Sequence, residues 1–203
     1  MNADLFSDSE SCHVIDLQGA DILFYPNFFD DEEADYYFNE LLRQLEWTQH
    51  RIRLYGKEYD VPRLSAWYAD QGKSYGYSGL RCAGLPWIAL LKTLMSRVNA
   101  LCSAPFNSVL ANRYRNGADG VGWHADDEPE LGSEPVIASL SFGQHRCFQL
   151  KHKTHKSLKK SFILPHGSLL IMQGKTQANW LHQIPKSSKA MQERINLTFR
   201  HVS

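Results

Sequence analysis

The chain has no long apolar run, so its sequence predicts no membrane-spanning helix. No stretch of its 203 residues approaches the roughly 20 apolar residues that cross a bilayer. The first residues are acidic and polar, unlike the basic start and apolar centre of a secretory signal. There is no internal repeat and no low-complexity segment. We therefore expect a monomeric protein without a membrane partner, in the cytoplasm, or in the nucleus if its source is eukaryotic.

Cysteine is scarce, and its spacing excludes the commonest cysteine sites. The four cysteines, Cys12, Cys82, Cys102 and Cys147, include no C-x-x-C pair of the kind found in zinc ribbons and redox couples. We expect them to be free thiols, partly buried.

The chain has no net charge, but its charges are unevenly distributed. Residues 1–46 contain 12 of the 22 acidic residues and one basic residue, Arg43, which leaves +11 on the rest of the chain. The most basic segment, residues 145–160, has no acid and contains Arg146, Lys151, Lys153, Lys156, Lys159 and Lys160. This segment is either a solvated hairpin or a surface that binds phosphate groups.

The order of predicted elements indicates a mixed, mostly β chain. Residues 21–29 read as a strand interrupted by Pro26, and Asp30 or Asp31 then caps an amphipathic helix. A second helix is predicted from Pro86 to about Leu101, with Leu90, Leu91, Leu94 and Val98 facing inward. Eight short strands separated by turn residues follow, which favours a jelly roll.

A candidate metal site is formed by His124, Asp126 and His182. Residues i and i+2 of an extended strand point to the same side, so His124 and Asp126 can reach one ion. His182 lies in a short apolar segment, residues 178–184, closed by Pro185 and expected to be a strand. Two imidazoles and one carboxylate leave coordination positions open, as non-haem Fe(II) oxygenases require. An H-x-D triplet alone is a weak signal, because such triplets also occur by chance.

Residues 194–200 strengthen this hypothesis. They alternate between Arg194, Asn196, Thr198 and Arg200 on one face and apolar residues on the other. The polar face either meets water or lines a pocket in which two guanidinium groups grip an anion such as a dicarboxylate. Asn112 and Tyr114, also two residues apart, offer neutral hydrogen-bonding groups to the same ligand.

Several motifs in order resemble the AlkB family of Fe(II)- and 2-oxoglutarate-dependent dioxygenases, which remove alkyl groups from nucleic-acid bases. The likeness covers about residues 61–199 and is greatest to the eukaryotic AlkB homologues 2 and 3. It rests on PRLSAWYAD (62–70), YGYSG (75–79), NRYRNGADGVGWHADDEPELG (112–132), IASLSFG (137–143), HGSLLIMQG (166–174) and RINLTFR (194–200).

The resemblance implies a double-stranded β-helix (jelly roll) with supporting N-terminal helices. One domain would span residues 21–203, with a nucleotide-recognition lid at about 47–84, after a mobile acidic tail at 1–20. It implies Fe(II) with 2-oxoglutarate and O2 as co-substrates, and a 2-oxoglutarate pocket built by Arg194, Arg200, Asn112, Tyr114 and Thr198. The implied reaction on 1-methyladenine or 3-methylcytosine releases succinate, CO2 and formaldehyde.

The residues between 51 and 79 interleave aromatic and basic side chains, as surfaces that stack bases and contact phosphates do. The aromatics are Tyr55, Trp67, Tyr68, Tyr75 and Tyr77, and the basic residues are Arg51, Arg53, Lys57, Arg63 and Lys73. Each aromatic taken singly is more often a core residue.

The resemblance places Tyr55, Gly56 and Lys57 on a substrate-gripping loop and Tyr75, Gly76 and Tyr77 on the lid. Tyr77 would stack on the flipped base, and Asp127 would lie at the base edge and favour a cationic alkylated ring. The alternative for Asp127 is a solvated turn. Some duplex-acting relatives have an apolar wedge near position 55, so the strand preference, and the choice between DNA and RNA, stay open.

Two other functions remain compatible with these residues. One is a hydroxylase that uses the same cofactors on a protein or small molecule, which would need a lid that excludes nucleotides. The other is a non-catalytic jelly-roll module with structural zinc. Structural zinc normally has four protein ligands, so a three-ligand site with two clamp arginines argues against this module.

Overall fold

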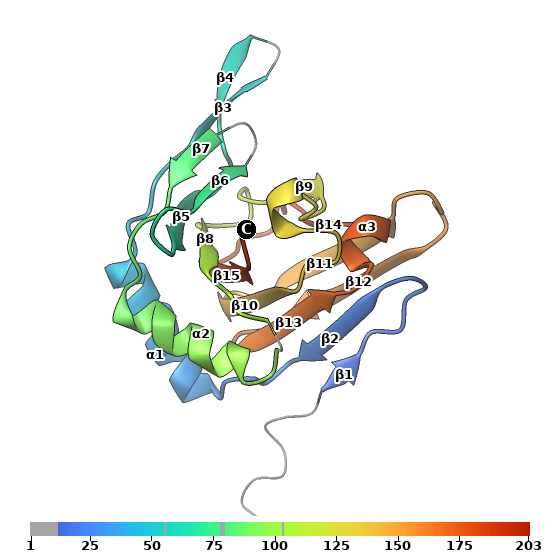
Figure 1. Cartoon of the computed structure of the whole chain (residues 1–203), viewed down its shortest axis with the longest axis horizontal. Helices are drawn as coiled ribbons and strands as arrows, with labels where there is room; N and C mark the ends of the chain where they lie inside the picture. The colour runs from blue at the N-terminus through green and yellow to red at the C-terminus, as the bar shows by residue number, and fades with distance from the viewer. Residues whose placement is uncertain (1–11, 55, 78–79, 103) are drawn as a thin grey trace, which may run out of the picture.

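The computed structural model describes residues 12–54, 56–77, 80–102 and 104–203, and only the backbone of residues 54, 74–77 and 80–83. Two antiparallel sheets form the body of the molecule (Figure 1). Along the seven-stranded sheet the order is β1 (His13–Val14), β2 (Asp21–Tyr25), β13 (Ser168–Gln173), β10 (Ile137–Gly143), β15 (Arg194–Arg200), β8 (Ser108–Tyr114) and β5 (Leu64–Ala69). Along the four-stranded sheet it is β12 (Lys159–Leu164), β11 (Arg146–His152), β14 (Trp180–Ile184) and β9 (Val121–His124).

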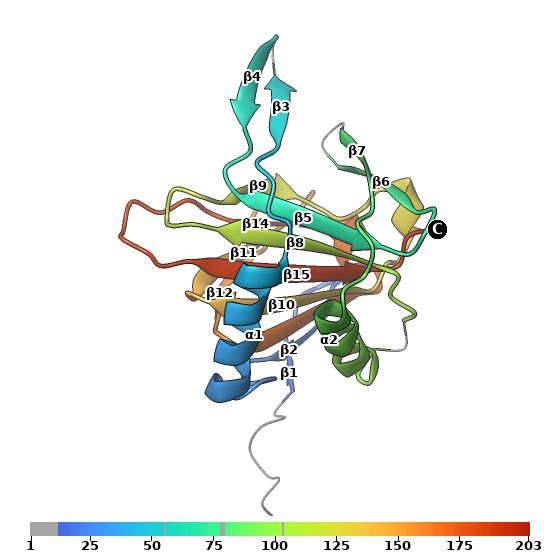
Figure 2. The same cartoon turned by 90° about the vertical axis from the view of Figure 1, so that its left-hand side faces the viewer.

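The eight strands predicted after the second helix are β8 to β15, and they confirm the jelly roll. Apolar side chains of both sheets meet between them, among them Leu150, Leu170 and Trp180, and close most of the interior. Two antiparallel hairpins extend from this body (Figures 1 and 2). They are β3 (Arg51–Leu54) with β4 (Lys57–Asp60), and β6 (Ser74–Tyr77) with β7 (Leu80–Ala83).

Helices α1 (Asp31–Gln44) and α2 (Ala89–Asn99) lie against the large sheet, on the side away from the small one (Figures 1 and 2). Their buried side chains join those of the large sheet in one cluster, as the apolar spacing predicts. Asp30 is the N-cap of α1 and accepts a hydrogen bond from the Glu33 backbone N–H at 2.8 Å. Within the described residues, no helix is both long and apolar enough to cross a membrane.

Two predicted boundaries are wrong by a few residues. The second helix was expected from Pro86 but begins at Ala89, because Leu85 exchanges backbone hydrogen bonds with β5 and holds this segment extended. The strand expected at residues 178–184 begins at Trp180, because a short helix, α3 (Thr176–Asn179), precedes it. A 3-10 turn, Pro129–Leu131, follows the predicted metal ligands.

The predicted tail and lid are divided differently by the structure. Residues 1–11 lie outside the described part, but β1 pairs with β2, and Ile15 and Leu17 pack against the core, so residues 12–20 are not a free tail. Within the predicted lid, β5 is the last strand of the large sheet, and only the two hairpins stand apart from it. The predicted lid therefore consists of two hairpins and one strand of the large sheet in the part of the chain that the structure describes.

Candidate metal centre

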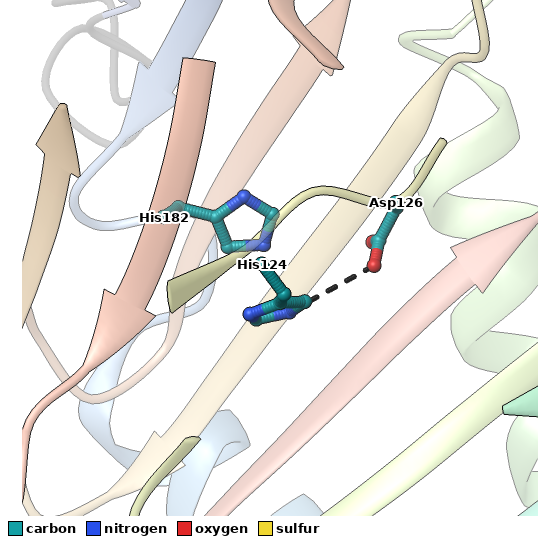
Figure 3. Close-up of side chains that lie close together, drawn as sticks. All are labelled: His124, Asp126 and His182. Carbon is teal, nitrogen blue, oxygen red and sulfur yellow. Dashed lines mark ion pairs between the residues drawn. The ribbon is translucent and has the colours of Figure 1, made fainter. Parts of the chain in front are cut away.

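His124, Asp126 and His182 converge at one end of the small sheet (Figure 3). His124 ends β9, Asp126 follows two residues later, and His182 lies on β14 directly opposite His124. One ligand atom from each residue lies within 4.8 Å of the other two. β9 is the edge strand of this sheet, and its pairing with β14 shifts register between His182 and Ile184. Tertiary pairing therefore brings in the third ligand, as expected.

Both imidazoles are prepared to coordinate a cation. His124 Nδ1 lies 2.8 Å from the Gly122 carbonyl oxygen, which can only accept, so Nδ1 carries the proton and Nε2 presents its lone pair. His182 is 6% exposed, and burial, together with His124 and Arg200, lowers its pKa to about 3 against the attraction of Asp126. His182 is therefore neutral at physiological pH, the form that binds metals.

Asp126 has one oxygen that is paired and one that has no partner. Its Oδ2 accepts hydrogen bonds from Arg200 Nη2 at 2.8 Å and Nε at 3.2 Å, while buried Oδ1 accepts none and lies 3.8 Å from His124 Nε2. Burial alone would raise its pKa, but Arg200 and the two histidines outweigh burial and lower the pKa to about 2. A buried, ionised oxygen facing two imidazoles fits a metal cation.

A cavity opens beside these three residues, and its volume is about 490 Å³ when the open space at its mouth is included. The strand β15 contributes its whole polar face to the cavity, so the solvent-facing alternative for that strand is wrong. All five residues predicted to bind the anion line it: Asn112, Tyr114, Arg194, Thr198 and Arg200.

Arg194 is the best placed of these residues to bind an anion. It is 1% exposed, its guanidinium lies 5.1 Å from the Tyr114 ring centroid, and Nη2 donates to the Ser141 hydroxyl at 3.0 Å. Its Nε and Nη1 are buried and have no hydrogen-bond partner among the described residues. Burial lowers its pKa to about 10, which keeps it charged at neutral pH. Two unpaired donors on a buried cation fit a carboxylate.

The other residues predicted to bind the anion already make hydrogen bonds within the protein. Arg200 donates side-chain hydrogen bonds to Asp126, so it positions the carboxylate as well as lining the cavity. The Asn112 side-chain oxygen accepts from Arg63 Nε at 2.8 Å, and the Thr198 hydroxyl donates to Asn196.

Arg63 is a cavity residue that the sequence interpretation missed. It is 5% exposed and lines the cavity, so its expected contact with a nucleic-acid phosphate is wrong. Its position two residues before Ser65 and four before Trp67, both on inner positions of β5, is the signal that could have placed it inside. Trp67 and Tyr68 are likewise core residues, 8% and 1% exposed, and not a base-stacking surface.

One of the basic residues of the segment at 145–160 is buried. Arg146 is 2% exposed, and its Nη2 donates to the backbone oxygens of Asp119 and Pro185 at 2.9 and 2.8 Å. It therefore joins two loops instead of facing phosphates. The lysines of the segment, by contrast, lie on β11, β12 and the turn between them, and Lys156, Lys159 and Lys160 are exposed.

The structure does not bring the predicted base-contacting residues together in one described site. Gly56, at φ +80°, lies in the turn between β3 and β4, and Lys57 is the first residue of β4; both are exposed, whereas Tyr55 lies outside the described residues. Tyr75, Gly76 and Tyr77 form β6, but their side chains are not described. Asp127 is exposed, and its Oδ2 accepts from Lys153 Nζ at 2.8 Å.

Comparisons with known proteins agree with this geometry. The sequence profile of the 2OG-Fe(II) oxygenase superfamily matches residues 21–200. The chain is 41% identical over 207 residues to alpha-ketoglutarate-dependent dioxygenase alkB homolog 3 of Mus musculus, covering 96% of this chain and 72% of that protein. It is 39% identical over 188 residues to DNA oxidative demethylase ALKBH2 of Homo sapiens, covering 88% and 72%.

A solved structure shares the fold at lower sequence identity. The structure of OsALKBH1 matches with a TM-score of 0.58 and 15% identity, over 93% of this chain and 100% of that one. At this identity the match concerns the architecture alone.

Proposed function

This chain belongs to the 2OG-Fe(II) oxygenase superfamily, and from that premise we propose how its residues carry out the oxidative dealkylation of nucleic-acid bases. It is an Fe(II)/2-oxoglutarate-dependent dioxygenase whose relatives include a DNA oxidative demethylase. Its substrate is alkylated DNA with lesions of the 1-methyladenine and 3-methylcytosine type. The observation that carries the residue assignment is the convergence of His124, Asp126 and His182, with a buried Asp126 oxygen left unpaired.

We propose that these three side chains hold Fe(II). Bound there, Fe(II), 2-oxoglutarate and O2 supply the oxidising chemistry, whose products are succinate, CO2, formaldehyde and the restored base. The protein supplies position and charge. Gly122 fixes the His124 tautomer, Arg200 aims the Asp126 carboxylate, and the buried walls of the cavity exclude water.

Arg194 would bind the far carboxylate of 2-oxoglutarate through its unpaired Nε and Nη1. We expect Arg194→Ala to raise the KM for 2-oxoglutarate roughly 10- to 100-fold, the loss of one or two charge-assisted hydrogen bonds, with a smaller change in kcat. Succinate release measured against 2-oxoglutarate concentration tests this. Arg113→Ala is the matched control, because Arg113 on β8 pairs with Glu193 and does not line the cavity. An unchanged KM in Arg194→Ala would contradict the assignment.

Asp127 would favour cationic alkylated bases at the mouth of the cavity. In the structure it pairs with Lys153, and the side chains are 55% and 27% exposed, so the pair is weak enough for a cationic base to replace Lys153. We expect Asp127→Ala to lower kcat/KM on 1-methyladenine and 3-methylcytosine about tenfold while 2-oxoglutarate binding stays the same. Glu134→Ala, another exposed carboxylate, is the control. Equal losses in both quantities would make Asp127 a structural residue.

The finer points of substrate and state are proposals as well. We propose that residues 21–203 act as one domain and as a monomer, because one chain supplies every candidate ligand and clamp residue. We propose that RNA is accepted along with DNA, and that the protein acts in the cytoplasm, or in the nucleus of a eukaryotic source. Tyr55, Gly56 and Lys57 would grip the substrate, and Tyr75, Gly76 and Tyr77 would cover the base.

A single assay distinguishes this function from its alternatives. Formaldehyde and succinate are measured with Fe(II), 2-oxoglutarate and matched methylated oligonucleotides, as DNA and RNA, single-stranded and duplex. Formaldehyde release from any of them supports nucleic-acid dealkylation. Succinate formation that no methylated oligonucleotide stimulates would favour a hydroxylase acting on a protein or small molecule.

A further inference from the structure

The outer face of the small sheet carries a second surface, separate from the metal cavity. Helices α1 and α2 cover the large sheet, and Figure 1 places them on the side away from β11 and β14. Side chains of β11 alternate, so buried Phe148 and Leu150 face the interior while Gln149 and Lys151 face outward. The small sheet therefore presents polar and basic side chains to the outside.

A groove crosses this outer face, and its volume is about 740 Å³ when the open space above it is included. Among the residues that the structure describes, its lining includes Trp123, Gln149, Lys151, Lys159, Lys160 and Ser161 and no acidic residue. Trp123 is 38% exposed, and Lys151 Nζ lies 4.3 Å from the centroid of its ring. An exposed indole held beside an ammonium group, with two more lysines along the groove, combines a stacking surface with positive charge.

The groove lies next to the metal cavity. Trp123 directly precedes the candidate ligand His124, so the two side chains of β9 point to opposite faces of the sheet. His124 pairs with His182, and His182 pairs with Leu150 of β11, which fixes β9 and β11 in the same direction. Asp127 and Lys153, three residues beyond His124 and Leu150, then meet at the same end of the sheet. Lys153 lies two residues beyond Lys151, so its pair with Asp127 links the segment after His124 to the strand that lines the groove.

We propose that this groove binds the single strand of nucleic acid that flanks the target base. Trp123 stacks on a flanking base, and Lys151, Lys159 and Lys160 contact its phosphates. The inference rests on the proposed function for the identity of the strand. Charge complementarity favours this occupant, because the lining is basic without an acid and a phosphate backbone is uniformly negative. A protein partner would instead fit an apolar centre with a polar rim.

The test compares binding of a 5-nucleotide and a 25-nucleotide single strand that carry the same methylated base. Fluorescence anisotropy is recorded with Fe(II) and 2-oxoglutarate but without O2, so that no turnover occurs. We expect Lys151→Ala/Lys159→Ala to weaken binding of the long strand about tenfold and to change binding of the short strand less than twofold. The salt dependence for the long strand should fall by about 1.4 in slope, since each phosphate contact on a single strand contributes about 0.7.

Two further variants keep the test sharp. Lys92→Ala/Lys175→Ala removes two exposed lysines outside the groove and should keep the wild-type ratio of long- to short-strand affinity. Trp123→Leu should weaken long-strand binding roughly fivefold or more and remove the quenching of tryptophan fluorescence that the long strand causes.

Different results would reject different claims. A wild-type ratio in Lys151→Ala/Lys159→Ala would overturn the groove as a nucleic-acid surface and leave a protein as its occupant. Equal losses for both lengths would also overturn it, because the lysines would then act at the target base or on the fold. Length-dependent binding that the groove variants reduce, without formaldehyde release by the wild-type enzyme, would support the groove and reject the proposed function.

Discussion

His124→Ala is expected to abolish succinate and formaldehyde release, with activity reduced at least about 1,000-fold. The substitution leaves two of the three candidate ligands, Asp126 and His182, and two protein ligands hold a ferrous ion weakly. Folding should survive, because the His124 side chain is 25% exposed and its Nδ1 hydrogen bond reaches only the nearby Gly122 carbonyl. Activity and iron content after dialysis are the measurements.

His201→Ala is the matched control for this loss. His201 is exposed, and its Nδ1 also lies against a backbone oxygen, that of Pro105, at 2.7 Å, but it does not line the cavity. The control should keep its activity and iron. Succinate production by His124→Ala at the parent rate would show that His124 is not a ligand.

Asp126→Ala is expected to destabilise the metal-free protein by about 3–5 kcal/mol as well as to remove activity. Asp126 and Arg200 are 2% and 4% exposed and pair at 2.8 Å, so removal of the carboxylate leaves a buried guanidinium without its counter-charge. Urea unfolding followed by circular dichroism gives the free energy of unfolding. Asp126→Asn keeps an oxygen for Arg200 and should lose less stability while still losing activity.

An ion pair on the surface serves as the reference for this loss in free energy of unfolding. Asp60 pairs with Arg51 at 3.0 Å, with side chains 61% and 68% exposed, so Asp60→Ala should cost at most about 1 kcal/mol. The double variant Asp126→Ala/Arg200→Met should lose less free energy of unfolding than the two single variants lose together, because both charges are removed at once. A loss in Asp126→Ala no larger than that in Asp60→Ala would contradict a buried ion pair.

The sequence predicted the site best where the two-residue repeat of a β-strand determines which side chains share a face. His124 and Asp126, and the alternating polar face of Arg194 and Arg200, follow from the two-residue repeat of a strand, and the structure places all four beside one cavity. The same repeat could not identify Asp126 as the partner of Arg200, because that pair spans 74 residues of sequence.

The sequence interpretation failed mainly to predict which arginines are buried. Arg146 lies in a run of lysines that are otherwise on the surface, and nothing in that run indicates that loop carbonyls of Asp119 and Pro185 receive its guanidinium. Arg63 was similarly placed among exposed basic residues. Long-range packing, not local composition, decides whether such a residue faces solvent or the interior.

The position of β9 has a mechanical consequence. This strand borders the small sheet, has one neighbour, and that pairing slips by a residue beside His182. Backbone hydrogen bonds therefore tether it less firmly than an interior strand. An ion bound by His124, Asp126 and His182 would cross-link β9 and β14. Metal binding would therefore also stabilise the edge strand of the small sheet.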